Sequence, residues 1–216
     1  MRKGFILLLI LLFPSIIYLL FSLGEHHVEK IGSFGDFKVN ELGDTSYVPV
    51  PDIVFTNQNG DVMHMDDFRG KPVVIDVIDV PCDEACGKKG VTLVNYLNEV
   101  PEREKWVVLS IGRRSEVTVE ELKQLQKAHL PEMDNWYFVT AEDEMELTAF
   151  LDYVFVQPGN VATLEDLPGK DFVLLDQQGI IRAYFDSRIH KENRKLEDAI
   201  KLIMKEPFMP WKEVKK

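Results

Sequence analysis

The two cysteines of this chain, Cys82 and Cys86, are separated by three residues in the stretch IDVIDVPCDEACGKKG (75–90). On a helical turn, side chains four positions apart share one face, close enough for a disulfide. Two thiolates on one face also suit a soft ion such as Cu(I). A bridge that closes so short a loop constrains the unfolded chain little, so it is a poor structural staple. The pair therefore indicates redox chemistry or Cu(I) binding, with a structural disulfide or two small buried residues as alternatives.

The flanking pattern predicts that a buried strand is followed by a helix at this pair. PVVIDVIDV (72–80) is apolar and β-branched, which is typical of a strand buried on both faces of a parallel sheet. In GKKGVTLVNYLNEV (87–100) the apolar residues recur at helical spacing. Cys82 is thus expected near a helix N-terminus, whose partial positive charge stabilises a thiolate. We expect Cys82 to attack a partner disulfide and Cys86 to resolve the mixed disulfide.

The rest of the chain alternates strand and helix patterns. DIVFTNQNGDVMHM (52–65) predicts a hairpin around Asn59-Gly60. Strands are predicted at 105–112 and 136–140, and helices from Thr118 to about Ala128 and over 142–155. Near the end of the chain, FVLLD and IIRAYFD predict a hairpin around Gln177-Gln178-Gly179. A last helix is predicted over 195–205. This order predicts an α/β fold, a thioredoxin-like sandwich with an N-terminal β-hairpin extension.

The N-terminal segment has the pattern of a membrane anchor. Arg2 and Lys3 precede an uncharged, mostly apolar stretch from Phe5 to Leu23, which matches the thickness of a bilayer. No small-x-small cleavage site follows, so a cleaved secretory signal is the weaker alternative. Basic residues before the span favour a cytoplasmic N-terminus. We expect a single-pass protein of the inner or cytoplasmic membrane whose C-terminal domain faces the periplasm or extracytoplasmic side, where disulfides form.

These patterns divide the chain into four parts. We expect the anchor at 1–24, a tether at 25–45, the thioredoxin-like domain at 46–205 and a C-terminal tail at 206–216. The formal net charge is −11 and the sequence pI is about 5.0. Because such a chain repels phosphate backbones, nucleic acid is not expected as a partner.

Several blocks in order carry a resemblance to a known family. They are VPDIVFTNQNG, GKPVVIDVIDVPCDEAC, VVLSIGRRSEVTVEELKQL, NWYFVT and FVLLDQQGIIRAYFD. Together these blocks, over about residues 46–205, resemble the Sco/SenC family. Its members are membrane-anchored, thioredoxin-like proteins linked to the assembly of the copper centre of cytochrome c oxidase. The resemblance implies the same fold, and Cys82 and Cys86 as the copper ligands or redox pair.

The chain departs from the family pattern at the copper site. The family's motif is usually C-P-x-x-C-P, whereas the nearby proline here, Pro81, precedes Cys82. The family's copper site adds one histidine, and the corresponding position falls at or beside Pro168, where this chain has none. The resemblance therefore implies an incomplete copper triad.

No other residue is an evident substitute for the missing ligand. The histidines at 26, 27, 64, 129 and 190 are expected to be solvated, as are the acids Glu165, Asp166 and Asp171 in the region of the missing ligand. Carboxylates are also poor partners for Cu(I). No second Cys/His pair stands at the spacing of a structural zinc site. The aromatic residues Trp106, Trp136, Phe138, Phe172 and Phe185 are expected to pack in the core.

The sequence thus predicts a membrane-anchored Sco/SenC-like protein that takes part in copper-centre assembly of cytochrome c oxidase by thiol-disulfide exchange through Cys82 and Cys86. A Cu(I) chaperone that uses the same two cysteines is one alternative. A non-catalytic tethered scaffold is the other. The expected partner is a cytochrome c oxidase subunit or another copper or thiol protein, and no cofactor other than copper is implied.

Overall fold

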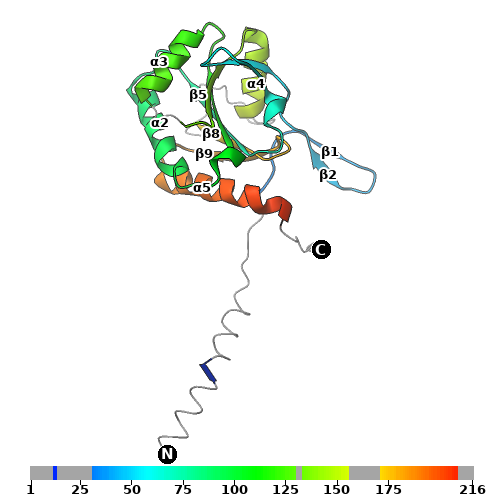
Figure 1. Cartoon of the computed structure of the whole chain (residues 1–216). Helices are drawn as coiled ribbons and strands as arrows, with labels where there is room; N and C mark the ends of the chain where they lie inside the picture. The colour runs from blue at the N-terminus through cyan, green and yellow to red at the C-terminus, as the bar shows by residue number, and fades with distance from the viewer. Residues whose placement is uncertain (1–11, 14–30, 130–132, 156–170, 209–216) are drawn as a thin grey trace, which may run out of the picture. The chain divides into compact units, whose positions relative to one another are not determined.

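The computed structural model describes residues 12–13, 31–129, 133–155 and 171–208 (Figure 1). The chain divides into two compact units, residues 1–30 and 31–216, and the second unit contains the sheet. Apart from Leu12 and Phe13, the anchor expected at 1–24 lies outside the described residues. Within the described ranges, no helix has the length and hydropathy needed to cross a bilayer.

A mixed sheet forms the centre of the second unit, with the strand order β4-β3-β7-β6-β5-β8-β9. β5, β6 and β7 run parallel, while the pairs β3–β4, β3–β7, β5–β8 and β8–β9 are antiparallel. The strands are β3 (Val54–Asn57), β4 (Val62–His64), β5 (Val73–Ile78), β6 (Val107–Gly112), β7 (Trp136–Thr140), β8 (Phe172–Leu175) and β9 (Ile181–Phe185).

Helices cover both faces of this sheet (Figure 1). They are α2 (Glu84–Leu97), α3 (Val119–His129), α4 (Glu144–Phe155) and α5 (His190–Lys205), with short 3-10 turns at η1 (Met65–Phe68), η2 (Arg103–Lys105) and η3 (Glu206–Phe208). Apolar residues of α4 and η1 pack on one face, and those of α2, α3 and α5 pack on the other. This layered arrangement fits the expected thioredoxin-like α/β fold.

Strand β5 lies in the middle of the sheet and is buried along its whole length, as its apolar sequence predicts. Val73, Ile75 and Val77 face the α4 side. Val74 and Ile78 face the α2, α3 and α5 side. Because side chains alternate along a strand, Asp76 lies on the α2 side, between Val74 and Ile78.

The strands and helices expected between residues 52 and 205 are confirmed. The hairpin around Asn59-Gly60 is β3–β4, and Gly60 has a φ of 88°, a left-handed conformation that suits glycine. It extends the main sheet, because Thr56 of β3 pairs with Thr140 of β7. The capping box of α3 is present: the Thr118 amide donates to Glu121 Oε2 at 2.9 Å.

Helices α2 and α5 both begin before the apolar stripes that predict them. α2 begins at Glu84, so Cys82 lies near a helix N-terminus, as expected. The side chain of Asp83 accepts a hydrogen bond from the Cys86 amide at 2.8 Å and so caps an additional first turn. α5 begins at His190, and its first turn includes the buried Asn193, whose side chain donates to the Ser187 carbonyl at 2.8 Å.

A small hairpin, which the sequence does not predict, lies in the segment expected to be a tether. β1 (Phe37–Val39) and β2 (Thr45–Tyr47) form a separate two-stranded antiparallel sheet that projects from the body (Figure 1). Just before it, Phe34 forms a bridge with Ile181 of β9. Phe37 and Val39 are each 59% exposed. Because the hairpin has no buried face, its sequence does not alternate between apolar and polar residues as a half-buried strand does.

Candidate redox site

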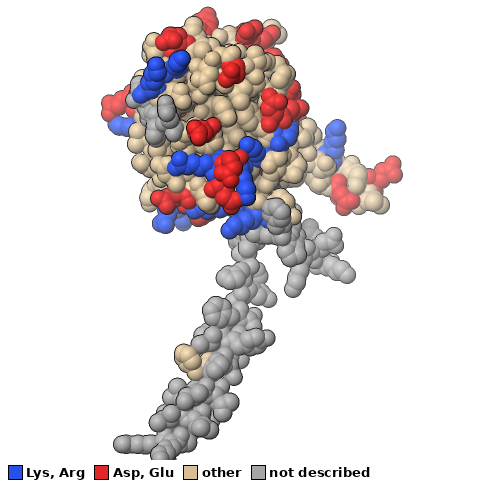
Figure 2. Space-filling model, in the orientation of Figure 1, with Lys and Arg blue, Asp and Glu red and all other residues tan. Residues whose placement is uncertain are grey.

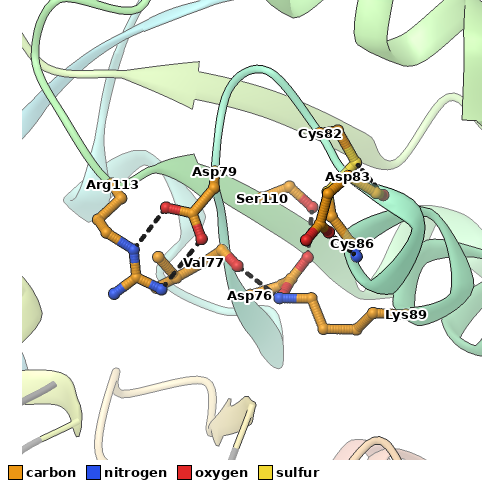
Figure 3. The surroundings of a disulfide bond; sticks show 9 residues. All are labelled: Asp76, Val77, Asp79, Cys82, Asp83, Cys86, Lys89, Ser110 and Arg113. Carbon is orange, nitrogen blue, oxygen red and sulfur yellow. Dashed lines mark hydrogen bonds and ion pairs between the residues drawn. A yellow bond between two sulfur atoms is a disulfide. The ribbon is translucent and has the colours of Figure 1, made fainter. Parts of the chain in front are cut away.

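Cys82 and Cys86 form a disulfide at the carboxyl end of β5 (Figure 3). Their Cα atoms are 5.4 Å apart, within the ordinary range for such a bond. Cys82 lies in the loop after β5, and Cys86 lies in the first turn of α2. Both residues are partly exposed and pack against the core on the α2 side. The structure thus brings together the two residues that the sequence singles out, while their role stays a prediction.

The loop that carries Cys82 connects the strand to the helix over five residues, 79–83. It contains a cis peptide bond between Val80 and Pro81. Asp83 ends the loop as the N-cap of α2 and ties its own side chain to the Cys86 amide. Cys82 therefore lies just outside the helix and Cys86 just inside it, near the positive end of the helix dipole.

The rim around the disulfide carries charges of both signs. Asp79 binds Arg113 at 2.7 Å, and Glu84 binds Lys88 at 2.6 Å on the exposed side of α2. Figure 2 likewise shows basic and acidic side chains next to one another on the visible face of the domain. Exposed pairs of this kind contribute little to stability and are screened by salt. The rim is thus a solvated, mixed-charge surface.

A small polar cavity of about 110 Å³ lies beside this rim. It opens where β5 and β6 end, next to the loop that leads to Cys82. Its lining consists of Asp79, Val80, Arg113, Arg114, Glu116, Val117 and Glu121. The cavity is large enough for water or one small side chain.

Beneath the first turns of α2, on the sheet, lies a buried polar group, Asp76. Lys89 of α2 reaches down to it, with its Nζ 2.6 Å from Asp76 Oδ1, and also donates to the Val77 carbonyl (Figure 3). From β6, the Ser110 hydroxyl donates to Asp76 Oδ2 at 3.2 Å. Trp136 Nε1 in turn donates to Ser110 Oγ at 2.9 Å. Asp76 is 2% exposed, so this pair is shielded from solvent.

Burial raises the pKa of Asp76 above its ordinary value, since desolvation disfavours the carboxylate. Lys89 and Ser110 act in the opposite direction but do not cancel this effect. Asp76 is not among the site residues predicted above. The sequence does carry a signal for it, because an acid in the middle of an apolar strand is energetically costly unless it has a partner or a function.

Of the other residues considered as ligands, His64 and His190 lie away from the disulfide, whereas Asp171 directly precedes Phe172, which pairs with Asp76 near the carboxyl end of β5. His64 is on β4, which three other strands separate from β5 in the sheet, and its Nδ1 is 3.2 Å from Asp52. His190 contacts Tyr96, ten residues after Cys86. Asp171 accepts a hydrogen bond from Ser187. His129 ends α3, and His26, His27, Glu165, Asp166 and Pro168 lie outside the described residues.

Within the described residues, no group of three or more His, Cys, Asp and Glu side chains could hold a metal ion. The aromatic residues expected in the core are there: Trp106, Trp136, Phe138, Phe172 and Phe185 are all at most 5% exposed and pack on the α2, α3 and α5 side. The reduced cysteine pair could offer two soft sulfur ligands by itself.

Comparisons with known proteins place this geometry in a fold family. No family model and no curated protein matches the sequence. Among solved structures, BsSco, described as a member of the Sco family of cytochrome c oxidase assembly proteins with a disulfide switch, aligns with a TM-score of 0.61. The alignment has 16% identity and covers 72% of this chain and 93% of BsSco.

Two further structures are of the same kind. A lipoprotein of the SCO1/SenC family from Bacillus anthracis aligns with a TM-score of 0.60 at 19% identity, over 72% of this chain and 94% of that one. The copper-bound ScoI of Arabidopsis thaliana aligns with a TM-score of 0.55 at 14% identity, over 71% of this chain and 97% of that one. The expected fold is confirmed: this chain has the thioredoxin-like fold of the Sco/SenC structures.

Proposed function

We propose that this protein carries out thiol-disulfide exchange through Cys82 and Cys86 during assembly of the copper centre of a cytochrome c oxidase. The observation that carries the proposal is a partly exposed disulfide between the end of β5 and the first turn of α2. The fold is that of proteins described as cytochrome c oxidase assembly factors, one of which has a disulfide switch. A bridge across so short a loop adds little chain-entropy stabilisation, which favours a chemical role over a structural one.

The exchange proceeds in two balanced steps. In the reduced protein, the Cys82 thiolate attacks a sulfur of the partner's disulfide, and the partner's other sulfur leaves as a thiolate. Cys86 then loses its proton and attacks Cys82 Sγ, so that the second partner sulfur leaves as a thiolate and the Cys82–Cys86 bond forms. The partner is reduced to a dithiol, as a copper ligand pair must be before it binds Cu(I). The N-terminus of α2 stabilises the thiolates.

The proposed location follows from the sequence. Residues 1–24 would anchor the chain in the inner or cytoplasmic membrane and hold the domain on the extracytoplasmic side. The oxidised state of the cysteine pair is compatible with that compartment. A cysteine-accessibility assay on intact cells tests the orientation. It uses Glu41→Cys in a variant whose Cys82 and Cys86 are replaced by serine. Labelling by a membrane-impermeant maleimide supports this location, and protection until lysis contradicts it.

A trapping experiment tests the exchange. With Cys86→Ser, the mixed disulfide on Cys82 cannot be resolved, so it accumulates. The full-length variant is reduced and mixed with an oxidase copper-centre domain whose two copper-binding cysteines are oxidised. We expect a covalent complex that reductant releases, and none with Cys82→Ser, the matched control. Failure of the wild-type protein to reduce this domain would refute the proposal.

Copper delivery is the second candidate, because both cysteines lie at one end of one helix and the fold is shared with a copper-bound ScoI. Here Cu(I) is cargo held by two thiolates. Competition with a calibrated Cu(I) chelator tests it. Equimolar binding by the reduced protein that is lost in Cys82→Ser/Cys86→Ser would favour the carrier. If neither binding nor exchange is found, a tethered scaffold remains.

A further inference from the structure

A second pocket lies at the amino ends of β5 and β6, opposite the disulfide. Its volume is about 500 Å³, within the range of pockets that hold small ligands. Its lining comes from the segments before β5 and β6, the turn after β8, the last turns of α5, and η3. The six residues of β5 separate this pocket from the loop of Cys82, a distance of roughly 17 Å. The pocket is therefore distinct from the redox site.

Four lysines line this pocket, which we call the lysine pocket, together with apolar side chains of three prolines and one methionine. The lysines are Lys71, Lys105, Lys201 and Lys205. The acids of the lining are Glu102 and Glu104, so four positive charges stand against two negative ones. The whole chain has a formal net charge of −11. The lining of the lysine pocket thus has the opposite sign to the protein as a whole.

Two of the four lysines already have a partner. Lys105 binds Glu102, and Lys201 binds Glu197. Lys71 and Lys205 are exposed, and neither forms an ion pair within the part of the chain that the structure describes. Because a lysine ammonium group binds phosphate as a point charge, these two side chains are available to an anionic ligand.

The chain enters the second unit beside the lysine pocket. Ile31 is the first residue of that unit, and its carbonyl accepts a hydrogen bond from Arg182 at 2.7 Å. The same guanidinium binds Glu206 at 2.6 Å, and Glu206 directly precedes Pro207 of the pocket lining. The entry point of the chain and the lysine pocket therefore lie at the same end of the sheet.

The length of chain before this entry point limits how far the pocket can be from a membrane. Seven residues, 24–30, connect the predicted membrane span to Ile31. Fully extended, they reach at most about 25 Å. A compact domain of this size is about 40 Å across. Because the connection is shorter than the domain, an anchored chain keeps the end with the lysine pocket within reach of the lipid headgroups.

The C-terminal sequence has the composition of a segment that binds a membrane interface. After Phe208 the chain continues as MPWKEVKK, outside the described residues, with one tryptophan and three lysines in eight positions. Tryptophan is enriched at membrane–water interfaces, and lysine is attracted to anionic lipids. This sequence follows directly on η3, which lines the lysine pocket. It therefore extends the basic character of this end of the domain.

We propose that the lysine pocket is a membrane-docking site that binds the headgroup phosphates of anionic phospholipids. This inference rests on the proposed membrane anchor, and the lipids are those of the membrane that holds it. Lys71 and Lys205 bind the phosphate, and the apolar side chains of the lining contact the glycerol backbone. Anionic lipids attract the lysine pocket and repel the acidic remainder of the domain. Docking thus orients the domain with its cysteine pair away from the bilayer.

The test compares two fluorescent probes on the full-length protein in vesicles. Glu104→Cys places the probe in the lining of the lysine pocket, and Glu84→Cys places it at the start of α2, near the disulfide. Each change removes one exposed glutamate in a variant whose Cys82 and Cys86 are replaced by serine. The vesicles contain phosphatidylcholine, with or without phosphatidylglycerol, and a lipid whose headgroup carries a nitroxide that quenches nearby fluorophores.

With phosphatidylglycerol present, we expect the probe at position 104 to be quenched at least about 3-fold more strongly than the probe at position 84. The difference should decline in high salt and in phosphatidylcholine alone. Lys71→Gln/Lys205→Gln should remove it. Lys123→Gln/Lys127→Gln on α3, the matched control, removes the same charge elsewhere and should retain it. Equal quenching of both probes, or a difference independent of lipid charge, would overturn the inference.

The outcome is separable from that of the exchange reaction. The cysteine pair is absent from the probe variants, so a failure of thiol-disulfide exchange would leave this result unchanged. Flotation of the full-length protein with the vesicles checks the anchor itself. A protein that does not float with them would remove the proposed anchor and this inference, while exchange through Cys82 and Cys86 could still be found.

Discussion

At the scale of single residues, the site combines an exposed, mixed-charge rim with a buried pair of Asp76 and Lys89. The cysteine pair could be predicted, because its spacing and its position after an apolar strand are local signals. The partnership of Asp76 with Lys89 could not, since it depends on which face of α2 meets β5. An isolated acid in a strand pattern indicates that desolvation of its carboxylate costs free energy. Only the packing of the folded chain shows which groups compensate for that cost.

The raised pKa of Asp76 predicts how stability varies with pH. Between its unfolded pKa, 3.8, and its higher folded pKa, the native state binds the proton more tightly. The free energy of unfolding contributed by this group therefore falls as pH rises through that window. Urea unfolding of the oxidised protein from about pH 4 to about pH 8 should show this decline relative to Asp76→Asn. Parallel stability curves for the two proteins would contradict the assignment.

At the scale of elements, the N-terminus of α2 organises the site. The cap formed by Asp83 allows the helix to begin at Glu84 and so places Cys86 within its first turn. The strand and the helix could both be predicted from their apolar periods. The first turn of α2 lies before the apolar stripe, so the stripe does not predict it. The β1–β2 hairpin is exposed on both faces, so its sequence shows no alternation of apolar and polar residues from which it could be predicted.

Removal of the cap should affect stability and chemistry together. Asp83→Ala is expected to lower the free energy of unfolding by about 1 kcal/mol. It should also increase the rate of Cys82 alkylation in the reduced protein, because a negative charge beside the thiolate is lost. Asp143→Ala is the matched control, since Asp143 accepts from the Met145 and Glu146 amides at the start of α4. It should lose similar stability without a change in alkylation, and an equal rate in both variants would refute the electrostatic account.

At the scale of the whole molecule, one buried arginine joins segments that are far apart in the sequence. Arg182 of β9 binds Asp176 at 3.0 Å and Glu206 of η3 at 2.6 Å. It also donates to the carbonyls of Ile31 and Gly32, 2.7 and 2.8 Å away. The guanidinium thereby connects residues 31–32 and η3 to β9 at the edge of the sheet. Contacts across about 150 positions leave no local trace, so the sequence could not predict this cluster.

Loss of this arginine should be costly. Arg182→Met leaves the carboxylates of Asp176 and Glu206 without their common partner, at side-chain exposures of 4% and 13%. We expect the free energy of unfolding to fall by about 3–5 kcal/mol, as measured by urea denaturation. Arg113→Met, which removes an exposed arginine bound to Asp79, should cost less than about 1 kcal/mol. If both variants lost a comparable free energy of unfolding, the stabilising role of Arg182 would be contradicted.

The central claim is that the Cys82–Cys86 bond is a working redox couple, and its reduction potential tests this most directly. The full-length protein is equilibrated in glutathione buffers of graded ratio, and the oxidised fraction is measured by acid quenching and alkylation. Because the bond is partly exposed and closes a short loop, we expect a reversible two-electron transition at a potential above about −300 mV. A bond that stays oxidised at every glutathione ratio would show a structural disulfide and contradict the account.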